Sequence, residues 1–310
     1  MTMDDLSLFT GKLEADTEQS LLSLDELVQV TAVTIGTHKL LTIVGFDRSP
    51  DCLLCLAVYC VAQIANAVQV NLQIRADLLG IDDQDSCEQL LQDVYSVIGK
   101  SNEAKTPKQK KWKEDERDPW LFEALSHLCV HLSIRNPDLL PVGTLVALVP
   151  MHGKVKKQGL DLVSVYVSPQ IGLGIGECKA RENNPWVGLQ AAADKFQNVD
   201  MGNYDPELRT VVGLIRFAVP AEQRNQMTRA FWKEERAYLP IIGYNANHNP
   251  QWSSEQDALK ELGVPPTHRL LIPLPLQDFR DFFDDLADAM RTYLESLKEE
   301  VQCSIPSPGV

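Results

Sequence analysis

The first third of the chain contains apolar segments of two kinds. Residues 28–46 are rich in β-branched side chains, a composition that predicts strands. Residues 52–70 carry no charged side chain, and three amide side chains within the run favour a buried helix over a membrane span. Apolar side chains recur at helical spacing over 85–99, which predicts another helix. We therefore expect an N-terminal α/β segment.

The stretch 100–118 is charged and almost free of aliphatic side chains, which predicts a linker. Beyond it, the patterns predict a helix, three strands, two helices, two strands and a closing helix. These elements are expected at 119–135, 143–151, two segments between 159 and 184, 186–199, 205–217, 237–246, 268–276 and from 279 onward. The order predicts an α/β fold with a mixed central sheet flanked by helices, divided into an N-terminal extension (1–117) and a second domain (118–303).

Charge is unevenly distributed along the 310 residues, whose net charge is −14. Residues 1–100 carry 5 basic and 15 acidic side chains, whereas residues 101–200 carry 13 and 12. An acidic chain is a poor general binder of nucleic acid, because contacts to phosphate need cations. Any contact with nucleic acid is therefore expected in the middle third.

The seven cysteines are odd in number and follow no spacing typical of disulfides. Cys52 and Cys55 form a C-x-x-C pair, but no second pair or histidine cluster completes a zinc site. We expect reduced cysteines in a cytoplasmic protein without a membrane segment.

The middle third also contains charged side chains within two segments that otherwise resemble buried strands. Glu177 and Lys179 are two residues apart, so in a strand they leave the same face. A hairpin turning near residues 169–170 would bring Asp161 beside Glu177. Two carboxylates and the backbone carbonyl of Cys178 form the kind of oxygen site that Mg²⁺ accepts. A neighbouring lysine can hold an attacking water or stabilise charge on a phosphate.

A bare E-x-K pattern is weak, and the chain contains a second one at Glu103–Lys105, within the predicted linker. The strand context favours Glu177 and Lys179, because burying charge costs several kcal/mol unless the charges pair or bind an ion. The alternative is a surface Glu–Lys pair at the end of a strand, with a solvent-facing Asp161.

The predicted helix at 186–199 offers amide side chains as additional site residues. We expect Gln190 to contact Lys179 or the attacking water, with Gln197 a weaker candidate. Glu123 could add a carboxylate, although a surface position is favoured for it. His127 and His131 are spaced to chelate a metal, but they lack the glutamate of H-E-x-x-H and are expected to be half-buried helix residues.

Two lysine clusters are the expected contacts to nucleic-acid phosphates if the site cleaves nucleic acid. One consists of Lys154, Lys156 and Lys157, just before Asp161, and the other occupies 108–113. The tryptophan of the second cluster and Trp186 are candidate stacking surfaces for bases. The usual interpretation of such lysine runs is a solvated surface.

The stretch "GLD…GIGECKARENNPWVGLQAAADKF" resembles the core of the PD-(D/E)xK nuclease superfamily. Together with the late strand "LLIPLPL" and the phenylalanine-rich helix after it, it is similar to the HamA family, the nuclease-like subunits of Hachiman anti-phage systems. The resemblance covers about residues 118–300. It implies a restriction-endonuclease-like core, Asp161 and Glu177 as metal ligands, and a catalytic Lys179. Leu160 stands where the superfamily motif has proline.

The resemblance further implies a Mg²⁺- or Mn²⁺-dependent DNA endonuclease that acts as effector in a defence complex. Its partner would be a helicase subunit of the HamB kind, with residues 1–117 as the docking region. Two alternatives remain open. One is a stand-alone restriction-like endonuclease, and the other is a non-catalytic interaction subunit that keeps a degenerate nuclease fold.

Overall fold

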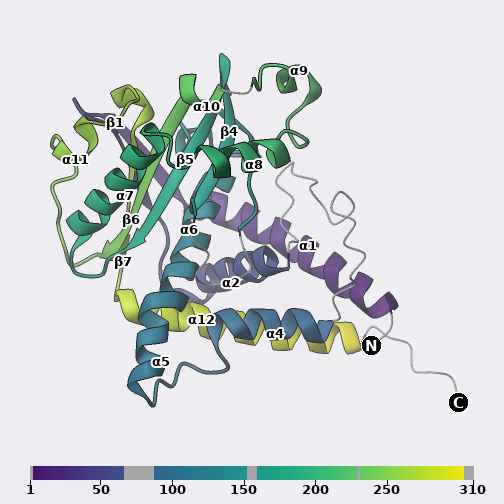
Figure 1. Cartoon of the computed structure of the whole chain (residues 1–310). Coiled ribbons are helices and arrows are strands. Elements are labelled where there is room, and N and C mark those ends of the chain that lie inside the picture. Colours follow the sequence, from purple (N-terminus) through teal and green to yellow (C-terminus); the bar gives the residue numbers. More distant parts are fainter. Residues whose placement is uncertain (1–2, 66–86, 152–158, 229–230, 304–310) are drawn as a thin grey trace, which may run out of the picture.

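The computed structural model of the chain describes residues 3–65, 87–151, 159–228 and 231–303. These residues form a seven-stranded mixed sheet flanked by helices, with strand order β1-β2-β7-β6-β5-β4-β3 (Figure 1). The four central strands β2, β7, β6 and β5 run parallel, and the pairings β1–β2, β5–β4 and β4–β3 are antiparallel. The predicted α/β fold with a mixed central sheet is confirmed.

The strands are β1 (Gln29–Thr34), β2 (Lys39–Val44), β3 (Thr144–Leu148), β4 (Leu162–Ser168), β5 (Gln170–Ala180), β6 (Arg236–Asn245) and β7 (Leu270–Leu276). The longer helices are α1 (Met3–Leu27), α2 (Pro50–Ile64), α4 (Cys87–Ile98), α6 (Asp118–Leu132), α7 (Pro185–Asp200), α8 (Asp205–Ile215) and α12 (Phe279–Cys303). The shorter helices are α5 (Pro107–Trp112), α9 (Ala221–Arg224), α10 (Phe231–Glu234) and α11 (Asp257–Lys260), with single turns η1 (Lys113–Arg117), η2 (Pro137–Leu139) and η3 (Pro266–His268). The predicted order of elements after residue 118 is confirmed, with the short helices added between its members.

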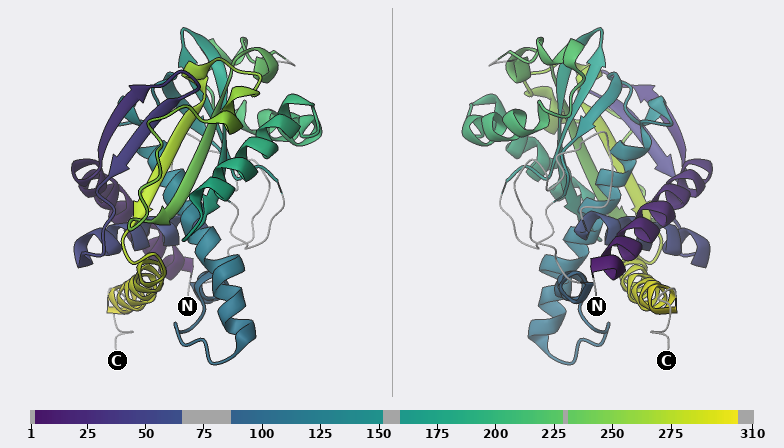
Figure 2. Two further views of the ribbon diagram at one scale, coloured as in Figure 1. Left: turned by 90° about the vertical axis from the view of Figure 1, so that its left-hand side faces the viewer. Right: turned by 90° about the vertical axis from the view of Figure 1, so that its right-hand side faces the viewer.

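The N-terminal segment extends the same sheet as the rest of the chain. Strand β2 pairs in parallel with β7, with Lys39 opposite Leu270. Helices α1 and α2 pack against each other and against α12, far away in sequence (Figure 2). The buried apolar side chains of residues 1–117 and 118–303 belong to one cluster. The two parts of the chain therefore share one sheet and one core, while a docking role for residues 1–117 stays a prediction.

The run predicted as a buried helix at 52–70 contains α2, most of whose side chains are buried. Residues 66–70 lie outside the described residues. No helix in the described part of the chain is long and apolar enough to cross a membrane.

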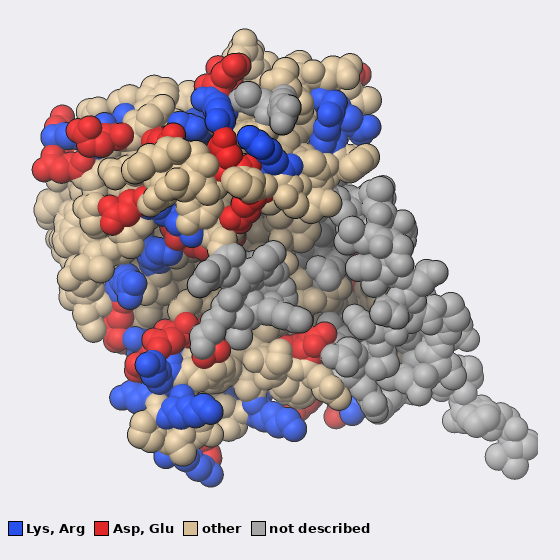
Figure 3. Space-filling model, in the orientation of Figure 1, with Lys and Arg blue, Asp and Glu red and all other residues tan. Residues whose placement is uncertain are grey.

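The charged stretch after α4 is mostly helical, so the prediction of a linker was wrong there. The side chain of Thr106 caps α5 in a capping box with Gln109, and Pro107 occupies the first turn. A π-helical turn, η1, joins α5 to α6 without a break. The exposed lysines of α5 form a basic end on this rod, visible at the foot of the molecule (Figure 3): Lys108, Lys110 and Lys111. Sequence pattern missed the helix because an apolar stripe is almost absent from it.

The hairpin β4–β5 forms as the sequence predicts. Ser168 pairs with Gln170 across a tight turn, and at the far end Leu162 pairs with Gly176. Asp161 comes directly before Leu162, the first residue of β4. It therefore lies opposite the part of β5 that follows Gly176. One hairpin therefore fixes the relation between Asp161 and the E-x-K segment.

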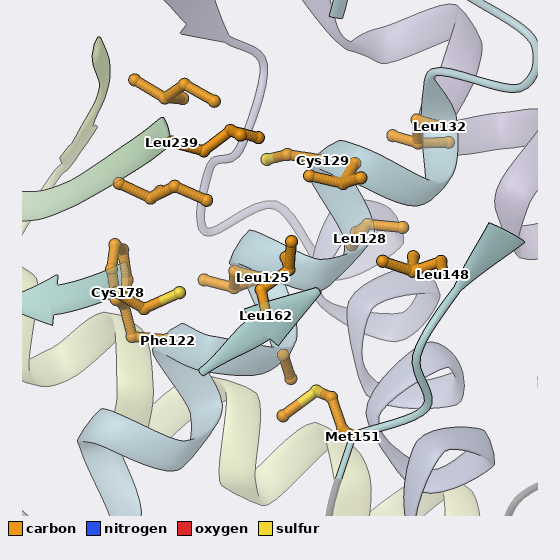
Figure 4. Close-up of a cluster of buried hydrophobic side chains, with 14 of the residues drawn as sticks. Phe122, Leu125, Leu128, Cys129, Leu132, Leu148, Met151, Leu162, Cys178 and Leu239 are labelled. Carbon is orange, nitrogen blue, oxygen red and sulfur yellow. The ribbon is translucent and has the colours of Figure 1, made fainter. Parts of the chain in front are cut away.

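Helices α6 and α7 cover opposite faces of β5. The side chain of Cys178 joins the apolar cluster beneath α6, beside Phe122 (Figure 4). Lys179, the next residue, leaves the other face, where a Cβ placed on Gly188 of α7 would lie 3.2 Å from the Cβ of Lys179. Helix α6 approaches the sheet closely because Gly243 has no side chain: a Cβ there would lie 2.3 Å from the Phe122 ring. These contacts set the position of both helices at the site.

Candidate active site

Three oxygen atoms of the predicted site surround the ammonium of Lys179. The ammonium donates to Oε1 of Glu177 and, at 3.2 Å, to the carbonyl oxygen of Cys178. Oδ2 of Asp161 lies 3.6 Å from the same Nζ and accepts the Cys178 N–H at 2.8 Å. The structure thus brings together four of the five predicted site residues, Asp161, Glu177, Cys178 and Lys179, and their burial contradicts the alternative of a solvent-facing Asp161 with a surface Glu–Lys pair.

Glu177 is buried, with 2% of its surface exposed. Its Oε2 is enclosed and has no hydrogen-bond partner within the described structure, although Nζ of Lys195 lies 3.7 Å away. Burial, together with the charge of Asp161, raises the pKa of Glu177 to about 7, against the opposing effect of the two lysines. Burial disfavours the charged form of Lys179, but the carboxylates outweigh it and hold the pKa of the lysine above its ordinary value. The site therefore concentrates charge that the described residues match incompletely.

Glu123 on α6 belongs to the same cluster, and the expectation of a surface position was wrong. The residue is half-buried, and burial followed by the charge of Asp161 raises its pKa to about 8. Lys179, Glu177 and Lys195 also act on it. Its own helical pattern could not reveal this position, because the packing of α6 over the end of the sheet decides it.

The side chain of α7 that reaches the site is Lys195, which the sequence analysis missed. Gln190, predicted as a partner of Lys179, is exposed and donates instead to Oδ1 of Asp194 at 2.8 Å. The reason is helical phase: Gly188 faces the strand, Lys195 follows it by two turns on the same face, and Gln190 leaves on the far side. The prediction for Gln190 identified the correct helix but assigned the side chain to the wrong face of it.

His127 and His131 do not form a metal site. Both are buried, and Tyr59 Oη lies 2.8 Å from Nδ1 of His127 and 3.1 Å from Nδ1 of His131. The other ring nitrogen of His127 lies 2.9 Å from the carbonyl oxygen of Val149. Burial lowers the pKa of His127 to about 4 and, with the repulsion of its neighbour, that of His131 to about 3. These histidines are neutral core residues, more deeply buried than the sequence suggested.

Of the remaining predicted contacts, the structure describes Trp186 but not the first lysine cluster. Lys154, Lys156 and Lys157 fall within 152–158, of which the structure describes nothing. Trp186, at the start of α7, is 43% exposed, and its ring centroid lies 4.6 Å from that of Trp252. Trp186 therefore presents an exposed aromatic surface whose ring packs against Trp252.

The donor atoms of the site fit a hard divalent cation. Asp161, Glu177 and the Cys178 carbonyl offer oxygen alone, with Glu123 nearby, and Mg²⁺ prefers oxygen ligands. The enclosed Oε2 of Glu177 accepts no hydrogen bond from any residue in the described part of the chain. A search of the described residues for three or more His, Cys, Asp and Glu side chains gathered around a metal position finds none. In the side-chain arrangement observed, Lys179 provides the positive charge that these oxygens require.

The fold and the site define an α/β protein with a buried carboxylate–lysine cluster at the end of a β-hairpin. Its chain matches no protein-family model, and a search of curated proteins gives no match. Function must therefore be argued from the geometry of the cluster.

Proposed function

We propose that the protein is a Mg²⁺- or Mn²⁺-dependent DNA nuclease that hydrolyses phosphodiester bonds. The observation that carries the proposal is the convergence of Asp161, Glu177 and the Cys178 carbonyl on the ammonium of Lys179. Such an arrangement of buried carboxylates with unmatched charge is typical of sites that bind an ion and act on it. The resemblance of the same residues to the PD-(D/E)xK superfamily supports the same reaction class.

Each residue has a role that follows from its chemistry. Asp161, Glu177 and the Cys178 carbonyl would hold the divalent cation, which supplies positive charge to a phosphate and lowers the pKa of a bound water. A lysine carries its proton at neutral pH, so Lys179 acts as a donor that orients the water or stabilises the phosphate. Glu123 adds a further carboxyl group at the end of the site, and a bound cation would favour its ionised form.

The basic end of the α5–α6 rod supplies a contact for the DNA backbone. An unbroken helix rises about 1.5 Å per residue, so Lys110 lies roughly 20 Å along the rod from Glu123. That distance corresponds to about six base pairs of duplex, at roughly 3.4 Å per pair. The exposed lysines of α5 would therefore hold the backbone about half a helical turn away from the bond that is cut.

The wider setting is proposed from the resemblance to the HamA family. We propose a cytoplasmic effector of an anti-phage complex whose helicase partner, of the HamB kind, delivers the DNA. The net charge of −14 agrees with weak binding of DNA by the isolated chain, since a basic partner would supply the missing affinity. Tight, salt-sensitive DNA binding by the chain alone would contradict this part of the proposal.

The test is plasmid cleavage with Mg²⁺ or Mn²⁺, with and without a candidate helicase partner. Glu177→Gln and Lys179→Met should each lower the rate at least about 100-fold, as loss of a group that acts in the transition state does. The matched controls are Glu103→Gln and Lys105→Met in the second E-x-K, an exposed pair whose ion pair is 2.8 Å long. These controls should cleave at the wild-type rate.

Two outcomes would overturn the assignment. Equal cleavage by the wild type and both site variants would remove the site from the reaction. No cleavage by the wild type under any condition, with the partner present, would favour the interaction subunit with a degenerate nuclease fold. Cleavage without any partner would instead favour a stand-alone restriction-like endonuclease.

A further inference from the structure

Asp161 stands outside the hydrogen-bonded ladder of the sheet. The first pair of the β4–β5 ladder joins Leu162 to Gly176, and Asp161 precedes it. Its carboxylate accepts a hydrogen bond from the Cys178 N–H. The backbone that leads into Asp161 must therefore be fixed by something other than strand pairing, because a ligand needs a defined position before an ion arrives.

We propose that Lys195 and Glu207 are positioning residues that clamp the backbone in front of Asp161. The inference rests on the proposed function and assigns these residues to the same metal site. The ammonium of Lys195 donates to the carbonyl oxygen of Gly159 at 2.5 Å. The carboxylate of Glu207 accepts the Leu160 N–H at 2.9 Å. Two successive residues ahead of Asp161 are thus held by two different helices, α7 and α8.

The ammonium of Lys195 contacts both the segment that leads into Asp161 and strand β5. Besides the Gly159 carbonyl, it lies 3.7 Å from Oε2 of Glu177 on β5. It also lies 5.0 Å from the centroid of the Tyr204 ring, a cation–π contact that restrains it further. One side chain therefore sets the lead-in to Asp161 relative to Glu177.

Gly159 shows how closely the clamp fits. Its φ of +151° is a backbone conformation that other residues rarely adopt. A Cβ at this position would lie 2.6 Å from Oε1 of Glu207, the atom that accepts the Leu160 N–H. Any side chain here would push Glu207 away from the backbone it holds. The glycine, the glutamate and the lysine form one unit.

The experiment measures Mn²⁺ affinity by titration calorimetry, which needs no substrate, together with kcat and KM for DNA cleavage. Glu207→Ala should weaken Mn²⁺ binding about 10-fold, within the range for residues that orient metal ligands. Glu207→Gln should bind like the wild type, because the amide oxygen still accepts the Leu160 N–H. Lys195→Met should weaken binding to a similar extent, and Lys195→Arg should restore it. Circular dichroism and thermal unfolding check that each variant is folded.

The glutamate pair separates position from charge, since Glu207→Gln removes the charge and keeps the acceptor. Equal weakening by Glu207→Gln and Glu207→Ala would mean that charge is responsible and would overturn the clamp. Wild-type affinity in folded Glu207→Ala and Lys195→Met would overturn it as well. Asp161→Asn is measured in parallel, because it tests the proposed metal site separately from the clamp. If the wild type and Asp161→Asn bind Mn²⁺ equally, the metal site itself fails; if only the Asp161 variant loses binding, the clamp alone fails.

Discussion

Helix α6 carries two carboxylates five residues apart, the buried Asp118 and the half-buried Glu123, and their surroundings differ in kind. Asp118 accepts from Arg117 Nε at 2.8 Å with one oxygen and from Arg280 Nη1 at 3.0 Å with the other. Arg117 is 1% exposed and also donates to Asp284 of α12 at 2.6 Å. Around Glu123, in contrast, carboxylates gather and their mutual repulsion adds to the cost of burial.

The contrast separates charge that stabilises the fold from charge that is available for the chemistry proposed above. Every oxygen of Asp118 has a cation, which fastens η1 and α6 to α12. Glu177, which acts electrostatically on Glu123, has an enclosed oxygen that no donor among the described residues contacts by a hydrogen bond. A protein that retains such unmatched charge gives up stability at that place, and functional sites are where this trade is found.

The largest expected effect is on the paired cluster. Arg117→Met should lower the free energy of unfolding by about 3–5 kcal/mol, because it leaves the buried carboxylate of Asp118 with one cation fewer. Glu177→Gln should leave that free energy unchanged or raise it, since it removes a buried charge with one oxygen that has no hydrogen-bond donor among the described residues, while Asp161 remains beside Lys179. Urea unfolding at pH 7.5 measures both. A loss of stability in Glu177→Gln as large as in Arg117→Met would erase the distinction between the two clusters.

An intermediate effect is expected from pH. The pKa of Glu123 is about 8 in the folded protein and ordinary, near 4.5, in the unfolded chain. Between these values the unfolded state releases a proton that the folded state keeps, so rising pH lowers stability, by at most about 1.4 kcal/mol per pH unit. Glu123→Gln lacks this titration. It should therefore match the wild type at pH 5 and exceed it by roughly 1–3 kcal/mol at pH 8.5.

Urea unfolding of both proteins at pH 5, 7 and 8.5 checks this pH dependence. Parallel pH profiles for the wild type and Glu123→Gln would show that the carboxyl group is satisfied in the fold. It would then belong with Asp118, among the stabilising charges.

The smallest effect concerns the basic end of the rod that carries both carboxylates. Changing Lys108, Lys110 and Lys111 together to Gln should raise KM for DNA a few-fold with kcat unchanged. It should also reduce the slope of log KM against log salt by about 1–3, because phosphate contacts release counterions. The matched control changes three exposed lysines elsewhere, Lys12, Lys260 and Lys298, to Gln. An equal effect of the control would mean that net charge, and not α5, governs binding.

Local features of the site could be read from the sequence, and those that depend on tertiary packing could not. The hairpin was predictable because alternation and a tight turn fix the register between Asp161 and Glu177 over a short span. Glu123 and Lys195 reach the site from separate helices, whose rotation about their axes is set by packing against the sheet. Gln190 shows the limit of sequence-based prediction. The sequence identified helix α7 but not which of its faces packs against β5. The helix α5 was missed because its sequence is polar. Its stability depends on capping and on ion pairs made by the turn that follows it.

The pairing of β2 with β7 has a consequence for how the protein is made. Leu270 is synthesised about 230 residues after its partner Lys39, which at roughly 5–20 residues per second means a delay of about ten to fifty seconds. During that time the N-terminal hairpin has no neighbour on the edge that will later join the sheet. All residues of the candidate site, up to Glu207, leave the ribosome before this pairing can form. The sheet is therefore completed late in synthesis, and a chain that stops before residue 270 leaves the edge of β2 open to other strands.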